Sequence, residues 1–254
     1  MGAREALVKA APDVQQRLLE LQAVDTAVAQ RAHRRRTLPE LAVIAEASQR
    51  LATLSGDVVR AQTEIGDLDR EQRRLELDVE QVCARSERDE QRLVSGAVTS
   101  PKELERLQHE VQSLARRQGD LEDQVLELME RRETADAALA DINRSVEQVT
   151  EQRAEATARR DAAFAEIDAE VSEREAERAR LTEELPTDLV ALYERIRASA
   201  GGIGAAALRQ RRCEGCRMEL ANTDVNRVRN APPDEVLRCE ECGRILVRIP
   251  ESGL

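Results

Sequence analysis

The chain has 254 residues with a formal net charge of −11; 35% of its residues are charged, and it holds one Tyr, one Phe and no Trp. This composition excludes an ordinary globular core of that length and favours long helices that pack along narrow apolar seams.

The first predicted element is a long helical segment over residues 12–94. Its seam residues alternate in steps of three and four, the heptad pattern of a coiled coil. Pro39 lies inside the segment and must end or kink its helix. The stretch opposite it, at 153–163, carries alanine and arginine in place of aliphatic residues, so we predict a bend at this level. The seam comprises Leu51, Leu54, Val58, Ala61, Ile65, Leu68, Gln72, Leu75, Val79, Val82, Ser86, Asp89 and Leu93.

A short connection at residues 95–101 follows. Gly96 can end one helix, Ser100 can cap the next, and Pro101 suits a first helical turn. A second seam then runs through residues 104–149. Because short connections make neighbouring helices antiparallel, the sequence predicts a long antiparallel coiled-coil hairpin within one chain, with facing residue numbers that sum to roughly 196.

The helical region is expected to cover residues 1–199, with a further break near Pro186 and a short helix after it. A flexible glycine-rich link at 200–204 should separate it from a small β domain at 205–254, where 236–238 and 245–249 look like strands. The predicted fold class is therefore mostly α, with a small C-terminal β ribbon.

Four cysteines in the last segment form two C-x-x-C pairs. Cys213 and Cys216 precede Cys239 and Cys242, and Gly243 can supply the positive φ of a metal knuckle. Two such turns brought together make the four-sulfur cage that Zn²⁺ prefers. We expect one structural zinc in a C4 zinc ribbon, with no open position for catalysis.

Other interpretations of these and the remaining reactive residues are weaker. A redox C-x-x-C normally lies in a βαβ unit, and disulfides need an oxidising compartment. Cys83 follows Val82 on a helical stripe and is interpreted as a small residue beside the seam. His33 and His109 are expected on helix surfaces. With no nucleophile, base or phosphate loop evident, no enzyme and no small-molecule substrate are predicted.

Several segments together resemble bacterial proteins that join a long coiled-coil hairpin to a C-terminal C4-type zinc ribbon, a conserved domain of unknown function. The resemblance implies a zinc-binding, non-enzymatic protein. Some relatives are associated with flagellar regulation or bind the sigma-54 transcription factor or messenger RNA, so transcription machinery is a possible partner. The resembling segments are 18–22 with Asp25, 38–40, 100–104, 121–123, 126–130 and 239–248.

The ribbon segment differs in charge from the rest of the chain. It has one more basic than acidic residue, although a zinc–tetrathiolate centre adds negative charge. Arginine forks suit phosphate, so RNA or DNA is a candidate ligand, but the arginines could equally shield thiolates or solvate strands. The candidates are Arg209, Arg211, Arg212, Arg217, Arg227, Arg229, Arg238, Arg244 and Arg248.

The ribbon has no aromatic residue on which bases could stack, so contacts to nucleic acid would be dominated by phosphates. The predicted function is a nucleic-acid-binding or transcriptional or post-transcriptional regulatory adaptor. The alternative is a protein–protein scaffold or chaperone-like adaptor that binds no nucleic acid. No leader-like or membrane-spanning segment is evident, so a cytoplasmic location is expected.

Overall fold

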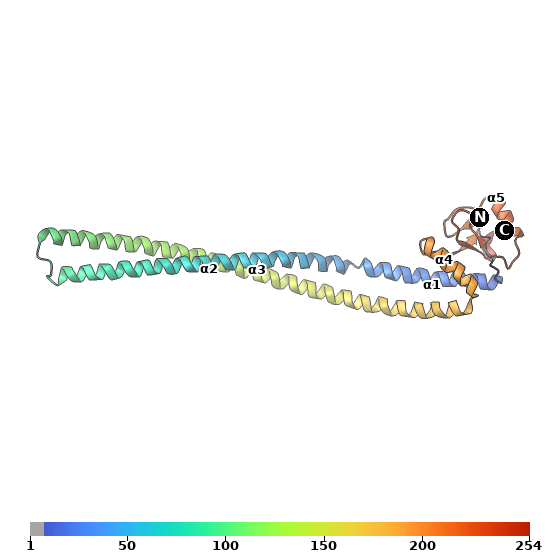
Figure 1. The fold of residues 1–254 in the computed structure, drawn as a ribbon, viewed down its shortest axis with the longest axis horizontal. Coiled ribbons are helices and arrows are strands. Elements are labelled where there is room, and N and C mark those ends of the chain that lie inside the picture. Colours follow the sequence, from blue (N-terminus) through green and yellow to red (C-terminus); the bar gives the residue numbers. More distant parts are fainter. Residues whose placement is uncertain (1–7) are drawn as a thin grey trace, which may run out of the picture. The chain divides into compact units, whose positions relative to one another are not determined.

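The computed structural model describes residues 8–254. The chain divides into two compact units: one combines the residues up to 41 with 158–254, and the other comprises 42–157. Long helices dominate both units (Figure 1). They are α1 (Pro12–Arg36), α2 (Pro39–Val94), α3 (Pro101–Glu184) and α4 (Thr187–Ser199).

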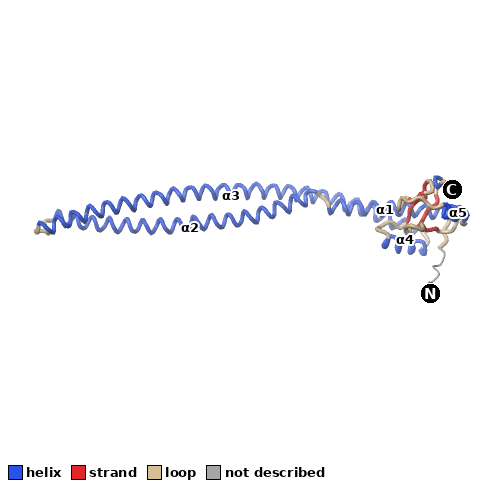
Figure 2. The backbone as a smooth tube through the Cα atoms, turned by 90° about the horizontal axis from the view of Figure 1, so that it is seen from above, coloured by secondary structure: helices blue, strands red, loops and turns tan. Residues whose placement is uncertain are grey.

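Within residues 42–157, α2 and α3 lie side by side in antiparallel directions, joined by the connection between Val94 and Pro101 (Figures 1 and 2). Leu68 and Leu128 belong to one buried cluster, as do Leu75 and Leu121, so facing residues have numbers that sum to 196. Each buried leucine contributes about 1.5–3 kcal/mol. The predicted antiparallel coiled-coil hairpin is confirmed.

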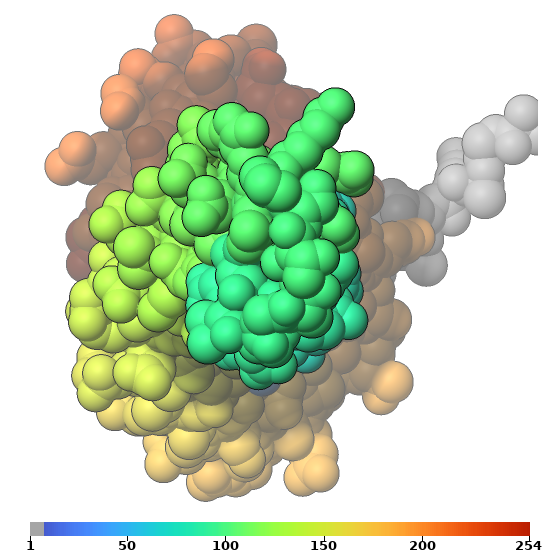
Figure 3. All heavy atoms as spheres, turned by 90° about the vertical axis from the view of Figure 1, so that its left-hand side faces the viewer, coloured from blue at the N-terminus to red at the C-terminus, as the bar shows by residue number. Residues whose placement is uncertain are grey.

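The closed end of the hairpin is formed by the turn between these helices. Figure 3 looks onto this end, where side chains of the turn and of both helices form one continuous surface. Gly96 has a φ of 69°, which lets the chain leave α2. At the start of α3, the backbone N–H of Leu104 donates to the carbonyl of Ser100.

Pro39 separates two helices, since α1 ends at Arg36 and α2 begins at Pro39. Proline at the start of α2 lacks only an N–H that would have no partner within the helix. On the opposite side, α3 continues as one helix through residues 153–163. A bend at this level stays a prediction.

The ribbon follows α4 as a four-stranded mixed sheet in the order β2-β1-β4-β3. β1 pairs antiparallel with β2 and parallel with β4, and β3 completes the sheet beside β4. The bounds are β1 Ala205–Arg209, β2 Arg212–Cys213, α5 Asn222–Asn230, β3 Leu237–Arg238, β4 Ile245–Arg248 and a final 3₁₀ turn η1 Pro250–Ser252.

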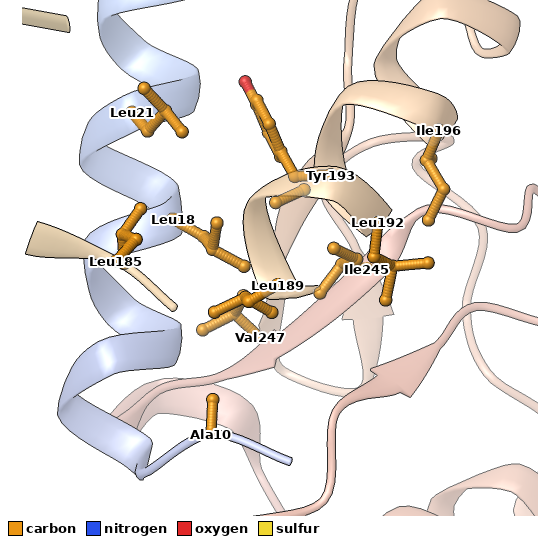
Figure 4. Packing of buried hydrophobic residues seen from close by; sticks show 11 residues of the cluster. Ala10, Leu18, Leu21, Leu185, Leu189, Leu192, Tyr193, Ile196, Ile245 and Val247 are labelled. Atoms are coloured by element: carbon orange, nitrogen blue, oxygen red, sulfur yellow. The ribbon is translucent and has the colours of Figure 1, made fainter. Parts of the chain in front are cut away.

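The core of this unit combines helices and ribbon strands. Leu18 and Leu21 of α1 pack with Leu189 and Tyr193 of α4 and with Ile245 of β4, all fully buried. Figure 4 shows these side chains pointing toward one another from the three elements. The small sheet therefore shares a hydrophobic core with the first and last helices.

Candidate metal centre and ribbon surface

Two knuckles bring the four ribbon cysteines together. The Sγ atoms of Cys213, Cys216, Cys239 and Cys242 all lie within 4.8 Å of one another. Sγ of Cys213 is 4.0 Å from that of Cys242, and Sγ of Cys216 is 3.9 Å from that of Cys239. A tetrahedron with Zn–S bonds of about 2.3 Å has S–S edges of about 3.8 Å. The donor set and its spacing fit one structural zinc, as predicted.

The two knuckles have the same backbone hydrogen bonds. The N–H of Arg217 donates to the carbonyl of Cys213 at 2.7 Å, and the N–H of Gly243 donates to that of Cys239 at 2.8 Å. Both closing residues are left-handed, with φ of 61° at Arg217 and 71° at Gly243. Glycine adopts this conformation without strain, whereas an arginine there has a conformational cost of about 1–2 kcal/mol.

Burial disfavours ionisation of the innermost thiols. It raises the pKa of Cys213 to about 12 and also raises the pKa of Cys239. Burial opposes ionisation of Cys242 as well, but hydrogen bonds from the backbone and side chain of Arg244 bring its pKa below the usual value. Buried thiolates of this kind need a cation to balance their charge, which a bound zinc ion supplies.

Three of the nine candidate arginines are partly buried and hold the ribbon's own backbone. Arg248 donates to carbonyl oxygens between Val228 and Glu235, at distances of 2.8–3.4 Å. Arg244 donates to the carbonyls of Ala200, Ile203 and Gly215. Arg238 donates to the carbonyl of Gly243 inside the second knuckle. These guanidinium groups have structural partners.

Other candidates have acidic or amide neighbours at the surface. Arg209 pairs with Glu214 at 2.8 Å, and Arg227 pairs with Glu240. Arg229 makes a long hydrogen bond of 3.4 Å to Asn226. Such exposed pairs are weak and can be exchanged for a ligand.

Arg211, Arg212 and Arg217 form the most available group. All three are exposed and lie at or beside the first knuckle. Within residues 8–254, the side chains of Arg212 and Arg217 make no hydrogen bond or ion pair, and that of Arg211 donates only to the carbonyl of Gly253. We call these three the knuckle arginines.

The tight turn between β1 and β2 carries Arg211, one of the knuckle arginines. Gln210 and Arg211 both have positive φ, of 47° and 61°. Their N–H groups donate to the carbonyls of Glu251 and Ser252, each at 2.8 Å. The 3₁₀ turn η1 thus stabilises the turn at Gln210 and Arg211, whose positive φ angles glycine or asparagine would adopt more readily.

A buried polar joint was not assigned a role from the sequence. The carboxylate of Asp25 accepts hydrogen bonds from Arg178 and Tyr193, both at 2.7 Å, and lies 3.1 Å from Nε of Arg197. Burial first, and then the hydrogen bond to Asp25, raise the pKa of the Tyr193 hydroxyl. The sequence signal that could have indicated this joint is Asp25 itself, an acidic residue beside the apolar residues Leu21 and Val24 of α1.

Gln22 extends this joint to the link at 200–204. Its Oε1 accepts from the N–H of Gly204 and lies 3.2 Å from the hydroxyl oxygen of Tyr193, whose hydrogen goes to Asp25, and its Nε2 donates to the carbonyl of Gly202. A Cβ at Gly204 would lie 2.7 Å from the Tyr193 ring. The link was expected to be flexible; its backbone is instead hydrogen-bonded to α1 and to Arg244.

Comparison with known proteins agrees with this architecture. Residues 21–201 match the CT398-like coiled coil hairpin domain, and residues 212–246 match the C4-type zinc ribbon domain. The chain belongs to the CT398-like coiled-coil hairpin family. The resemblance noted from the sequence is thereby confirmed.

Relatives of the CT398-like family align over nearly the whole chain. An uncharacterized protein of Mycobacterium tuberculosis, Rv2229c, is 38% identical over 95% of this chain and 98% of its own. A solved structure from Mycobacterium smegmatis covers 95% of this chain and all of its own, with 35% identity and a TM-score of 0.84. CT398 from Chlamydia trachomatis covers 93% of this chain and 98% of its own, with 20% identity and a TM-score of 0.71, and so supports the fold.

The zinc ribbon and the coiled-coil hairpin fit a non-catalytic binding protein. None of the helices over residues 8–254 combines the length and apolar character that crossing a membrane requires.

Proposed function

We propose that this protein is a regulatory adaptor whose zinc ribbon binds nucleic acid through phosphates. The observation that carries the proposal is the exposed group formed by the knuckle arginines Arg211, Arg212 and Arg217, which lack an acidic partner among the described residues. The other candidate arginines have carbonyl, carboxylate or amide partners within the ribbon.

The conformation of Arg217 adds support. Its backbone occupies the position that glycine fills in the second knuckle, where an arginine has a conformational cost. The exposed side chain does not offset this cost through contacts within the ribbon, so we attribute the arginine at this position to ligand binding. Because the ribbon has no aromatic platform, the binding is proposed to depend on the sugar–phosphate backbone and to be weakly sequence-selective.

Direct binding tests this proposal. The change is Arg211→Ala with Arg212→Ala, which keeps all four thiolates. Fluorescence anisotropy with several unrelated RNA and DNA oligonucleotides should show similar losses for each, and the slope of log K against log salt should fall by roughly 0.7–0.9 for each lost contact. Zinc content should remain that of the wild type.

A matched control removes two hairpin arginines instead. Arg60 and Arg70 each pair with an aspartate three residues earlier, so Arg60→Ala with Arg70→Ala changes the net charge equally. This control should bind like the wild type. If the wild-type chain fails to bind either nucleic acid even at low salt, the proposal is wrong.

The second candidate is a protein scaffold that binds no nucleic acid. A groove of about 710 Å³ favours it; this groove lies between α1 and β1, with small residues such as Ala23, Ala27 and Ala207 in its lining. A partner held there would survive nuclease treatment, and replacement of Ala27 by a bulky residue would remove it without affecting the knuckle arginines.

A further inference from the structure

The two flanks of the hairpin seam carry different charge patterns. On one flank lie the residues that directly precede a seam residue in α2 or α3. Arg85 and Glu110 belong to this flank and form an ion pair of 2.6 Å across the seam. The same flank places Arg92 and Glu103 in the lining of one groove, and Asp78 and Arg117 in the lining of another. Opposite charges across a coiled-coil seam stabilise it.

The other flank opposes like charges at one level. Glu76 of α2 and Glu122 of α3 line one groove together with Glu80. The ion pairs of the described hairpin residues involve other acids, and these three glutamates have no cationic partner among them. Glu76 and Glu122 accept hydrogen bonds only from Gln72 and Gln118 on their own helices. Like charges in this arrangement destabilise the pair of helices that carries them.

The groove between these glutamates has an apolar floor. Val79, Val125 and Leu126 line it, and its volume is about 460 Å³. Leu126 is 57% exposed, and Met129, one helical turn further along α3, is 43% exposed. An apolar floor between two antiparallel helices, with acidic edges, has the form that accepts a third amphipathic helix.

We propose that this acidic groove binds a basic amphipathic helix of a partner protein. Apolar side chains of the helix would cover Val79, Val125 and Leu126, while its lysines or arginines would pair with Glu76, Glu80 and Glu122. The charge of the groove favours a cationic helix over other partners, because such a helix would neutralise the repulsion between Glu76 and Glu122 that remains in the unbound hairpin. This site lies within residues 42–157 and is independent of the zinc ribbon.

The experiment uses the full chain and a synthetic heptad-repeat peptide with leucine at its core positions and lysine beside them. Glu76→Gln with Glu122→Gln should weaken binding about tenfold, since two ion pairs are lost. The control, Glu71→Gln with Glu127→Gln, alters two exposed acids outside the groove lining and should leave the affinity unchanged. A peptide with glutamate in place of lysine should not bind.

A second pair of variants tests the apolar floor. Leu126→Ser should weaken peptide binding, whereas Leu77→Ser, at a site equally exposed at 56% but outside the groove lining, should not. A photoreactive group on the peptide's apolar face should label Val79 or Leu126. The proposal would be overturned if a control variant lost as much peptide affinity as the groove variant it is matched to, or if the photoreactive group labelled residues outside the groove. So would sedimentation showing that a second copy of this chain fills the groove.

Discussion

At the residue scale, Asp25 shows how one buried carboxylate can hold distant segments together. Its side chain is 1% exposed, and its partners Arg178, Tyr193 and Arg197 come from α3 and α4. A buried charge is tolerated only when it is paired and hydrogen-bonded. The joint therefore depends on every member being present.

Substitution of Asp25 by Ala should lower the free energy of unfolding by about 3 kcal/mol, because Arg178 and Arg197 lose their buried carboxylate partner and keep only Glu194, which is partly exposed. Tyr193→Phe should cost about 1.5–3 kcal/mol, the range for hydrogen bonds to charged groups. Chemical denaturation measures both changes. Asp57→Ala, which breaks an exposed pair with Arg60, should cost under about 1 kcal/mol; a similar loss there would contradict the special role of Asp25.

Arg217 allows conformational and binding roles to be separated. Arg217→Gly relieves the left-handed backbone and should raise the ribbon's stability by up to about 1 kcal/mol with zinc retained. If Arg217 contacts phosphate, the same variant should bind nucleic acid more weakly. Thermal denaturation and anisotropy measure the two effects, and a variant that loses zinc would contradict the structural part of the expectation.

At the scale of elements, the hairpin register gives a direct chemical test. In a Cys83→Ser background, cysteines introduced at Leu68 and Leu128 should form cross-links within one chain, because both side chains belong to one buried cluster. Peptide mass spectrometry and denaturing gels locate the link. Cross-links found only between chains would instead indicate a domain-swapped dimer.

Zinc removal tests the ribbon as an element. Cys239→Ser, or chelation of the wild type, should unfold the ribbon, because structural zinc supplies about 10–16 kcal/mol of apparent binding energy in small fingers. Since α1 and α4 share their core with β4, hydrogen exchange should also accelerate in these two helices. Exchange in residues 42–157 should not change. Full zinc occupancy in Cys239→Ser would contradict the ligand assignment.

The helices and the metal site could be predicted because their signals are local or periodic. The seam repeats every three or four residues, and each pair of thiols is set by one turn. The partners of Arg244 and Arg248 could not be predicted, since their carbonyl acceptors are fixed only by the folded backbone. The Asp25 joint was also hidden, because Arg178 and Tyr193 lie more than 150 residues away in the chain.

At the scale of the whole molecule, one unit is built from both ends of the chain and the other from its middle. The bond between Gln22 and Gly204 spans 182 residues, and β4, near the C-terminus, completes the core that begins with α1. Contacts this distant in sequence form slowly, whereas the hairpin needs only a short loop to close. During synthesis the hairpin is therefore expected to form first. The helix α1 would then pack only after β4 has been made, and the second pair of thiols would emerge only after the whole hairpin.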